Sequence, residues 1–202
     1  MKNIYMSVDV KSDGPCIISN SITEFSVVAI SDETGHVIDK ISFYLERREN
    51  SEVNEVIKKR NMEHIKNTIY ENLEVIRVPP KEAMKRLSLF CEDLFTRYNL
   101  IWVGWPANYD WAFLRSYFLN YKDEDSAYVF PYNCRCIQEK EETLFNMRLL
   151  DEEKRKSIKN SIKIDVLKEP FKELTKSTIA ATIQGKIFFQ YLKIENENKN
   201  RE

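Results

Sequence analysis

Two aspartates stand where their carboxylates could act together in a chemical reaction. Asp9 is at the end of an alternating apolar run near the start of the chain, and Asp110 follows an apolar run that ends at Trp105. Hydrolysis of a phosphodiester by two metal ions needs several carboxylates at one point, where they hold two divalent cations about 3.5–4 Å apart. Asp9 and Asp110 are therefore candidate catalytic residues and candidate ligands of Mg²⁺ or Mn²⁺.

The residue two positions after Asp9 is Lys11, which is basic. Residues i and i+2 of a strand point to the same face, so we expect the Lys11 ammonium to lie beside the Asp9 carboxylate. An ammonium 4 Å from a divalent cation is repelled by about 8 kcal/mol at an effective dielectric constant of about 20. We therefore predict that Lys11 neutralises Asp9 and Asp110 in place of a metal.

The elements that must position these residues can be predicted from apolar periodicity. Strand-like runs at residues 4–10, 22–30 and 36–45 are joined by short turns, which predicts an antiparallel meander. The run at 100–105 is almost wholly apolar, as is usual for a parallel strand buried on both faces between helices. Residues 162–166 are predicted as a further strand.

Helical spacing of apolar residues predicts helices over residues 81–98, 111–121 and 177–192. Residues 51 to about 72 and 139–156 are also helix-prone, and Asn108 is a candidate cap for the helix that follows it. Strands followed by helix–strand–helix indicate the α/β class, with one mixed sheet flanked by helices. We predict a single domain over residues 1–193 and a solvated tail at 194–202.

Composition narrows the classes of protein and of partner. The chain has 202 residues, 43% hydrophobic residues and a net charge of −1, so a nucleic acid would have to be held locally. The sequence predicts no membrane span and no signal peptide. The four cysteines lack zinc-site spacing, which favours reduced thiols and a cytoplasmic location; they are Cys16, Cys91, Cys134 and Cys136.

Three segments together resemble the motifs of the DEDD-type 3′–5′ exonucleases, and in particular those of the ribonuclease T-like 3′ exoribonucleases. SVDVKSDGP resembles the first motif, VGWPANYDWAFLRSYF the second, and TIAATIQGKIFFQYL the helix of the last. The order is that of the family, from about residue 4 to residue 192. The resemblance implies a ribonuclease H-like mixed sheet, an Mg²⁺ or Mn²⁺ cofactor, and the 3′ end of a single-stranded nucleic acid as partner.

The resemblance also implies which family positions have changed. Asp9 and Asp110 match two of the four metal-binding carboxylates. Lys11 stands where the first motif has its Glu, and Ala180 (or Ala181, one residue later) stands where the last motif has its Asp. The family's His or Tyr, which positions the attacking water, falls near Thr175.

Three residues around Asp110 also match the second motif: Asn108, Tyr109 and Trp111. They are candidates for shaping the site or for binding nucleic acid, since aromatic rings stack on bases of single strands. Aromatic residues next to an apolar strand are more often core, and we expect that of at least two among Trp105, Tyr109 and Trp111. Acids that could replace the missing ligands are weaker candidates: Asp13, Glu24, Asp165, Glu169 and Glu173.

Three hypotheses follow. The first is a pseudo-exonuclease, with weak or absent catalysis and retained binding of nucleic acid. The second is an active, metal-dependent 3′–5′ exonuclease with a rearranged site. The third is a protein-interaction module that reuses the fold. Family members often pair, so a homodimer is a further expectation. The missing acids favour the first hypothesis over the second.

Overall fold

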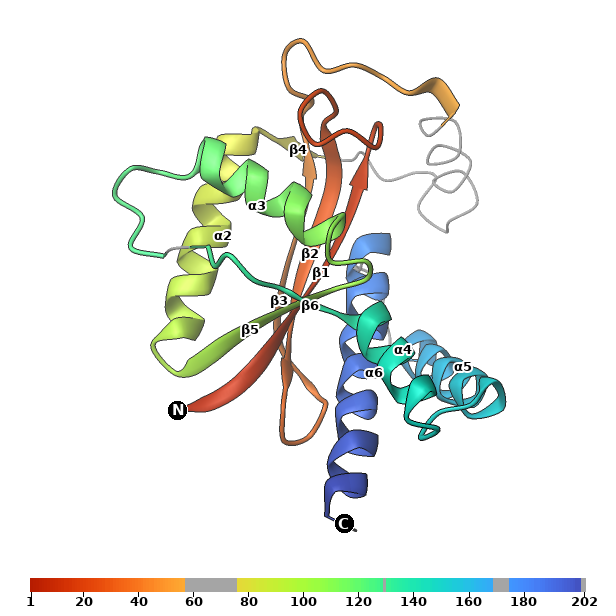
Figure 1. Ribbon diagram of the computed structural model, residues 1–202. Helices are drawn as coiled ribbons and strands as arrows, with labels where there is room; N and C mark the ends of the chain where they lie inside the picture. Colours follow the sequence, from red (N-terminus) through yellow and green to blue (C-terminus); the bar gives the residue numbers. More distant parts are fainter. Residues whose placement is uncertain (57–75, 129, 169–174, 201–202) are drawn as a thin grey trace.

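The computed structural model describes residues 1–56, 76–128, 130–168 and 175–200 (Figure 1). Within these residues one six-stranded sheet has the order β4-β3-β2-β1-β5-β6. Its strands are β1 (Lys2–Ser12), β2 (Ile22–Ser31), β3 (Val37–Leu45), β4 (Arg77–Val78), β5 (Tyr98–Gly104) and β6 (Arg135–Cys136). The chain is therefore an α/β protein in which the central strand, β1, carries both Asp9 and Lys11.

The pairing of the strands is mixed. β1, β2 and β3 form the predicted antiparallel meander, whereas β5 runs parallel to β1 on its other side. The short strands β4 and β6 extend the two edges in parallel with β3 and β5. This arrangement is consistent with a ribonuclease H-like sheet, and it confirms the predicted fold class.

Helices cover both faces of the sheet (Figure 1). α2 (Pro80–Phe95) and α3 (Asp110–Tyr121) lie on one face, and α6 (Lys176–Lys199) lies on the other with α4 (Ile137–Asn146) and α5 (Glu152–Lys168) beside it. Successive residues of a strand point to opposite faces. Met6 and Val8 therefore join the core under α2 and α3, while Tyr5 packs edge-on against Phe188 of α6.

Several predictions about the second half of the chain were wrong. Residues 162–166 are helical, because Ile162 and Val166 are buried one helical turn apart while Ile164 between them is exposed. The segment 139–156 is divided between α4 and α5 by a turn in which Arg148 has a φ of 57°. α6 continues to Lys199, past the predicted end of this helix at residue 192.

Further predictions concern the burial of β5, the segment that starts at residue 51, the cysteines and membrane-spanning helices. Only Trp102 to Gly104 of β5 is buried, so this strand is not covered along its whole length. The helix-prone segment from residue 51 to about 72 lies mostly in 57–75, outside the described residues. All four cysteines are free. No helix in the described part of the chain has the length and apolar character needed to span a membrane.

A buried carboxylate joins α4, α5 and α6. Glu141 is 8% exposed and accepts hydrogen bonds from Lys159 at 2.7 Å, from Arg155 at 3.3 Å and from the Tyr191 hydroxyl. Burial alone would raise the pKa of Glu141, but these donors outweigh it and lower that pKa. The charged form of Glu141 therefore stabilises the packing of α6 against its neighbours.

Substitution Glu141→Gln is expected to lower the free energy of unfolding by about 2 kcal/mol at neutral pH, as is typical for hydrogen bonds to a charged group. Because the folded pKa is depressed, this contribution is present above the ordinary glutamate value and is lost as pH falls through the folded pKa. Urea unfolding at neutral and acidic pH checks both points. Glu152→Gln, which breaks an exposed pair with the same Arg155, should change little; equal losses in the two variants would contradict the expectation.

Candidate functional site

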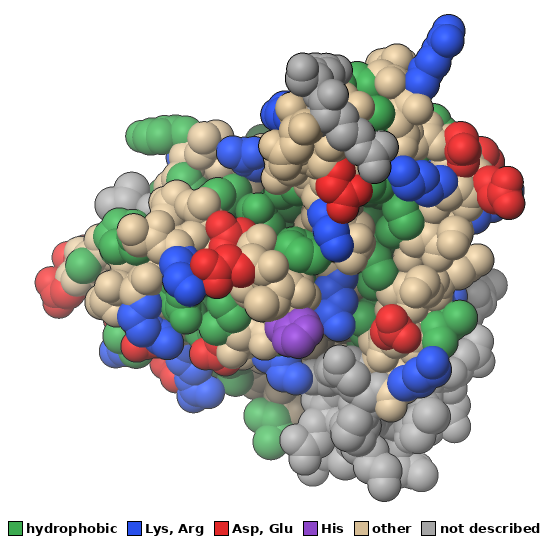
Figure 2. Space-filling view, turned by 90° about the horizontal axis from the view of Figure 1, so that it is seen from below, with side chains coloured by type: hydrophobic (Ala, Val, Ile, Leu, Met, Phe, Trp, Pro, Cys, Tyr) green, Lys and Arg blue, Asp and Glu red, His purple; other side chains and the backbone are tan. Residues whose placement is uncertain are grey.

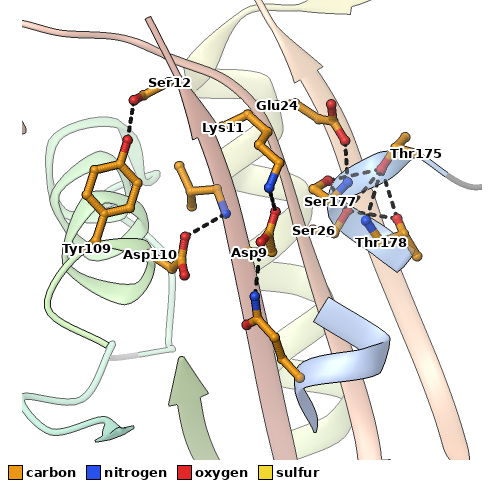
Figure 3. A network of polar contacts seen from close by, with 12 residues as sticks. Asp9, Lys11, Ser12, Glu24, Ser26, Tyr109, Asp110, Thr175, Ser177 and Thr178 are labelled. Atoms are coloured by element: carbon orange, nitrogen blue, oxygen red, sulfur yellow. Dashed lines mark hydrogen bonds and ion pairs between the residues drawn. The ribbon is translucent and has the colours of Figure 1, made fainter. Parts of the chain in front are cut away.

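The site begins on β1, where Asp9 and Lys11 point to the same face of the strand (Figure 3). The Lys11 ammonium donates to Asp9 Oδ2 at 2.6 Å, and Gln184 of α6 donates from Nε2 to Asp9 Oδ1 at 3.1 Å. Asp9 is 4% exposed, whereas 35% of the Lys11 side chain is exposed. Both carboxylate oxygens of Asp9 therefore bind donors from the chain itself.

Asp110 reaches the same strand from the first turn of α3. Its Oδ1 accepts the Val10 backbone N–H at 3.1 Å, and the residue is 4% exposed. Val10 lies between Asp9 and Lys11, so the contact places the Asp110 carboxylate beside the ion pair (Figure 3). The structure thus brings together the two aspartates, which are 101 positions apart in the chain.

Burial changes the protonation of both aspartates. Desolvation raises the pKa of Asp9 to about 6, even though Lys11 acts to lower it. Desolvation, with the nearby charge of Asp9, raises the pKa of Asp110 to about 8. At neutral pH the two carboxylates together carry about one negative charge, which the Lys11 ammonium balances. Burial acts to lower the pKa of Lys11, but the surrounding acids outweigh it and raise that pKa.

The start of α6 closes the site with hydroxyl groups. Thr175 caps the helix by accepting the Thr178 backbone N–H, and its hydroxyl contacts Ser42 at 2.8 Å. Ser26 lies at the centre of the cluster and contacts Ser177 at 2.6 Å (Figure 3). Thr175 is the residue nearest to the position implied for the family's water-positioning His or Tyr, and here it serves as a helix cap.

Gln184 lies further along α6, six residues after Thr178, and reaches Asp9 from the helix. Ala180 is four residues before Gln184 and so shares its face of the helix. Gly185 lets α6 approach the sheet, because a Cβ there would lie 2.7 Å from Ile30 Cδ1 and 2.9 Å from Ser7 Cβ. The close approach explains how a glutamine of ordinary length reaches Asp9.

The other candidate acids have structural partners. Asp13 binds Arg47 at 2.8 Å and the Ser21 N–H at 2.6 Å. Glu24 is 6% exposed and accepts the Ser177 N–H at 2.7 Å. Asp165 lies on α5 with 65% of its side chain exposed, away from the sheet. Glu169 and Glu173 lie outside the described residues.

The donor set does not fit two divalent cations. Among the described residues no group of three His, Cys, Asp or Glu side chains is arranged to hold a metal ion. At the candidate site an ammonium lies 2.6 Å from one of the two aspartates, where a cation would be repelled. We therefore derive no metal-dependent step from this geometry.

The residues around Asp110 take different places. Asn108 is exposed and lines a cavity of about 290 Å³ with Cys134 and Cys136. Its predicted capping role was wrong, because α3 starts after Tyr109 without a side-chain cap. Tyr109 and Trp111 are half-buried against the core. The Tyr109 hydroxyl also contacts Ser12 at the rim of the site (Figure 3).

Comparison with solved structures shows the same architecture in several nucleases. A 3′-exonuclease that recognises the 3′ end of a histone mRNA stem-loop superposes with a TM-score of 0.56 at 15% identity, over 95% of this chain and 82% of that one. Product-bound exonuclease I gives 0.58 at 12% identity, over 96% of this chain but only 46% of its own. Pop2p of S. pombe, with Mg²⁺ and Mn²⁺ bound, gives 0.52 at 13%, over 92% and 81%.

The chain has the fold of the DEDD-type 3′-exonucleases. No protein-family model and no curated protein sequence matches it. Identities of 11–15% show the fold alone, so activity must be argued from the site. In the exonuclease fold of this chain, β1 and α3 supply one aspartate each, and α6 supplies Gln184 and hydroxyl groups.

Sequence reasoning missed two features of the site. Gln184 as a partner of Asp9 depends on a contact across 175 positions; the one signal was the Gln-Gly pair in the last motif. The hydroxyl cluster joins residues of β2, β3 and α6, and no spacing along the chain points to it.

Proposed function

We propose that this protein is a pseudo-exonuclease, in which an internal lysine replaces the catalytic metals and the surface around Asp9 and Asp110 binds the 3′ end of a single-stranded nucleic acid. One observation carries the proposal: the Lys11 ammonium lies 2.6 Å from Asp9, at the place where the family's metal site is expected. Hydrolysis is then weak or absent, because an ammonium carries a single charge and cannot activate water or stabilise the leaving oxygen as two divalent cations do.

The surrounding contacts support a settled metal-free state. Gln184 binds the second oxygen of Asp9, and burial raises the pKa of Asp110 to about 8, so most of it is neutral at pH 7. Thr175 is engaged in capping α6 and has no basic atom with which to activate water. The Asp9 oxygen, the Asp110 carboxyl and the Thr175 hydroxyl are thus each occupied or neutral, whereas an active nuclease needs such groups to bind metal or water.

Binding of nucleic acid is supported by the neighbours and by local chemistry. The similar structures include exonuclease I in complex with single-stranded DNA and the enzyme that recognises a histone mRNA stem-loop. On the face drawn in Figure 2, basic and acidic side chains are interspersed, with no broad field of one sign. A strand would therefore be held by a few local groups and not by general attraction. Dimer formation and a protein partner stay predictions.

The proposal is tested by titrating the protein with Mn²⁺ in a calorimeter and by following trimming of 3′-tailed single-stranded RNA and DNA. We expect no heat of binding at micromolar Mn²⁺ and no trimming, together with measurable binding of the same strands. Micromolar Mn²⁺ binding with trimming that Asp110→Asn abolishes would show an active nuclease with a rearranged site instead.

A further inference from the structure

Arg115 of α3 lies over two aromatic rings, those of Trp111 and Tyr132. The guanidinium of Arg115 lies 5.5 Å from the ring centre of Trp111 and 4.9 Å from that of Tyr132. Its Nε donates to the Pro131 carbonyl at 3.0 Å, which fixes its plane. Tyr132 is 88% exposed although it is a large aromatic residue.

The charge of Arg115 is not balanced locally. Arg115 forms no ion pair with any acid in the described part of the chain, whereas the surface arginines Arg86 and Arg97 each bind a carboxylate. A guanidinium with free N–H groups in a fixed plane suits phosphate oxygens, and the flanking rings suit bases. Both chemistries occur together in one ligand, which is a single-stranded nucleic acid.

The position of the cluster along α3 suits a single-stranded nucleic acid whose 3′ end lies at Asp9 and Asp110. Trp111 directly follows Asp110, and Arg115 is one turn further along α3 on the same face. The segment after α3 returns toward β6 (Figure 1). On this segment the ring of Tyr132 lies against Arg115 of the helix. Along the chain the cluster therefore begins at the residue after Asp110 and continues toward the end of α3.

We propose that Trp111, Arg115 and Tyr132 form a binding surface for the nucleotides upstream of the 3′ end, in which Tyr132 stacks on a base and Arg115 contacts a phosphate. The inference rests on the proposed binding of single strands and names a second contact region for them. Nucleic acid is the occupant that we argue for, because a free guanidinium beside an exposed ring matches the phosphate and the base of one nucleotide.

The test measures binding of labelled single strands of about 12 nucleotides, as RNA and as DNA, by fluorescence anisotropy. Tyr132→Ala and Arg115→Gln are each expected to weaken binding about tenfold, and Arg115→Gln to reduce the salt dependence by about 0.7 in the log–log slope. Phe95→Ala and Arg97→Gln are matched controls, since they remove an exposed ring from the end of α2 and a surface charge from the turn before β5. Both controls should bind as the unchanged chain does.

A mononucleotide separates the two parts of the model. A mononucleotide occupies only the surface around Asp9 and Asp110. Tyr132→Ala should therefore not change the affinity with which a mononucleotide binds there. If the unchanged chain binds single strands and the Tyr132 and Arg115 variants bind equally well, the surface is not used and the proposed function still stands. If the unchanged chain binds neither RNA nor DNA, the proposed function and this inference both fall.

Discussion

A chain that carries both Lys11→Glu and Ala180→Asp is expected to bind Mn²⁺ at about micromolar concentration, where the unchanged chain binds none. The two substitutions place carboxylates at the positions where the family resemblance implies them. At position 11 a repulsion of about 8 kcal/mol becomes an attraction of similar size, for a charge 4 Å from a divalent cation at a dielectric constant of about 20. Water and side-chain motion reduce the net gain but not its sign.

Stability gives a second measure of the same change. Without metal, the double variant places two new acids beside Asp9, Asp110 and the buried Glu24, so their mutual repulsion should lower its melting temperature. Mn²⁺ should restore stability, by about 2.7 kcal/mol at one hundred times the dissociation constant. The unchanged chain should show no such shift, because Lys11 already neutralises the site.

Controls decide whether position or charge matters. Lys193→Glu makes the same change of charge as Lys11→Glu, but on an exposed turn of α6, and should leave Mn²⁺ binding absent. Binding of metal is the readout and not trimming, because Thr175 has no basic group for water and acid–base catalysis typically contributes 10²–10⁴-fold. If the double variant folds but does not bind Mn²⁺, the side chains at positions 11 and 180 do not point to one common site.

The sequence predicted this site to the extent that short-range periodicity determines it. Asp9 and Lys11 lie on one strand, so a period of two was enough to place the ammonium beside the carboxylate. The place of Asp110 could be predicted because the apolar strand before it and the helix after it are local patterns. The contact between Gln184 and Asp9 could not be predicted, since it depends on how closely α6 packs at Gly185.

The errors in the second half have a physical cause as well. In residues 162–166, apolar and charged residues alternate, which is the pattern of a half-buried strand. In the structure these residues continue helix α5, and their burial follows the helical period. Ile162 and Val166 are buried, whereas Ile164 is exposed. Tertiary packing, which the alternation does not encode, selected the helical period.

The largest effect on stability is expected from Lys11→Met, which keeps most of the apolar length of the side chain and removes its charge. Removing one partner of a buried ion pair leaves the other charge uncompensated, and we expect a loss of roughly 3 kcal/mol in the free energy of unfolding at about pH 8. Breaking a buried ion pair typically costs about 3–5 kcal/mol, and the low end applies here because part of Lys11 is exposed. Equilibrium unfolding in urea at several pH values measures it.

The pH dependence has a definite sign. Burial raises the folded pKa of Asp9 to about 6 and that of Asp110 to about 8, both above the ordinary value of 3.8. A group with a raised folded pKa stabilises the fold most when it is protonated, and this contribution is lost as pH rises through that pKa. Without Lys11 both values should rise further, so the variant should lose stability more steeply than the unchanged chain between about pH 5 and pH 8.

Lys2→Met provides the comparison, because Lys2 forms an ion pair with Glu33 on the exposed surface. It should change stability little at any pH, since exposed pairs contribute weakly. At about pH 5 the Lys11 variant should approach the unchanged chain, because both aspartates then carry protons and need no cation. An equal loss at pH 5 and pH 8 would show that Lys11 acts through packing, and its assignment as the internal replacement for a metal would be wrong.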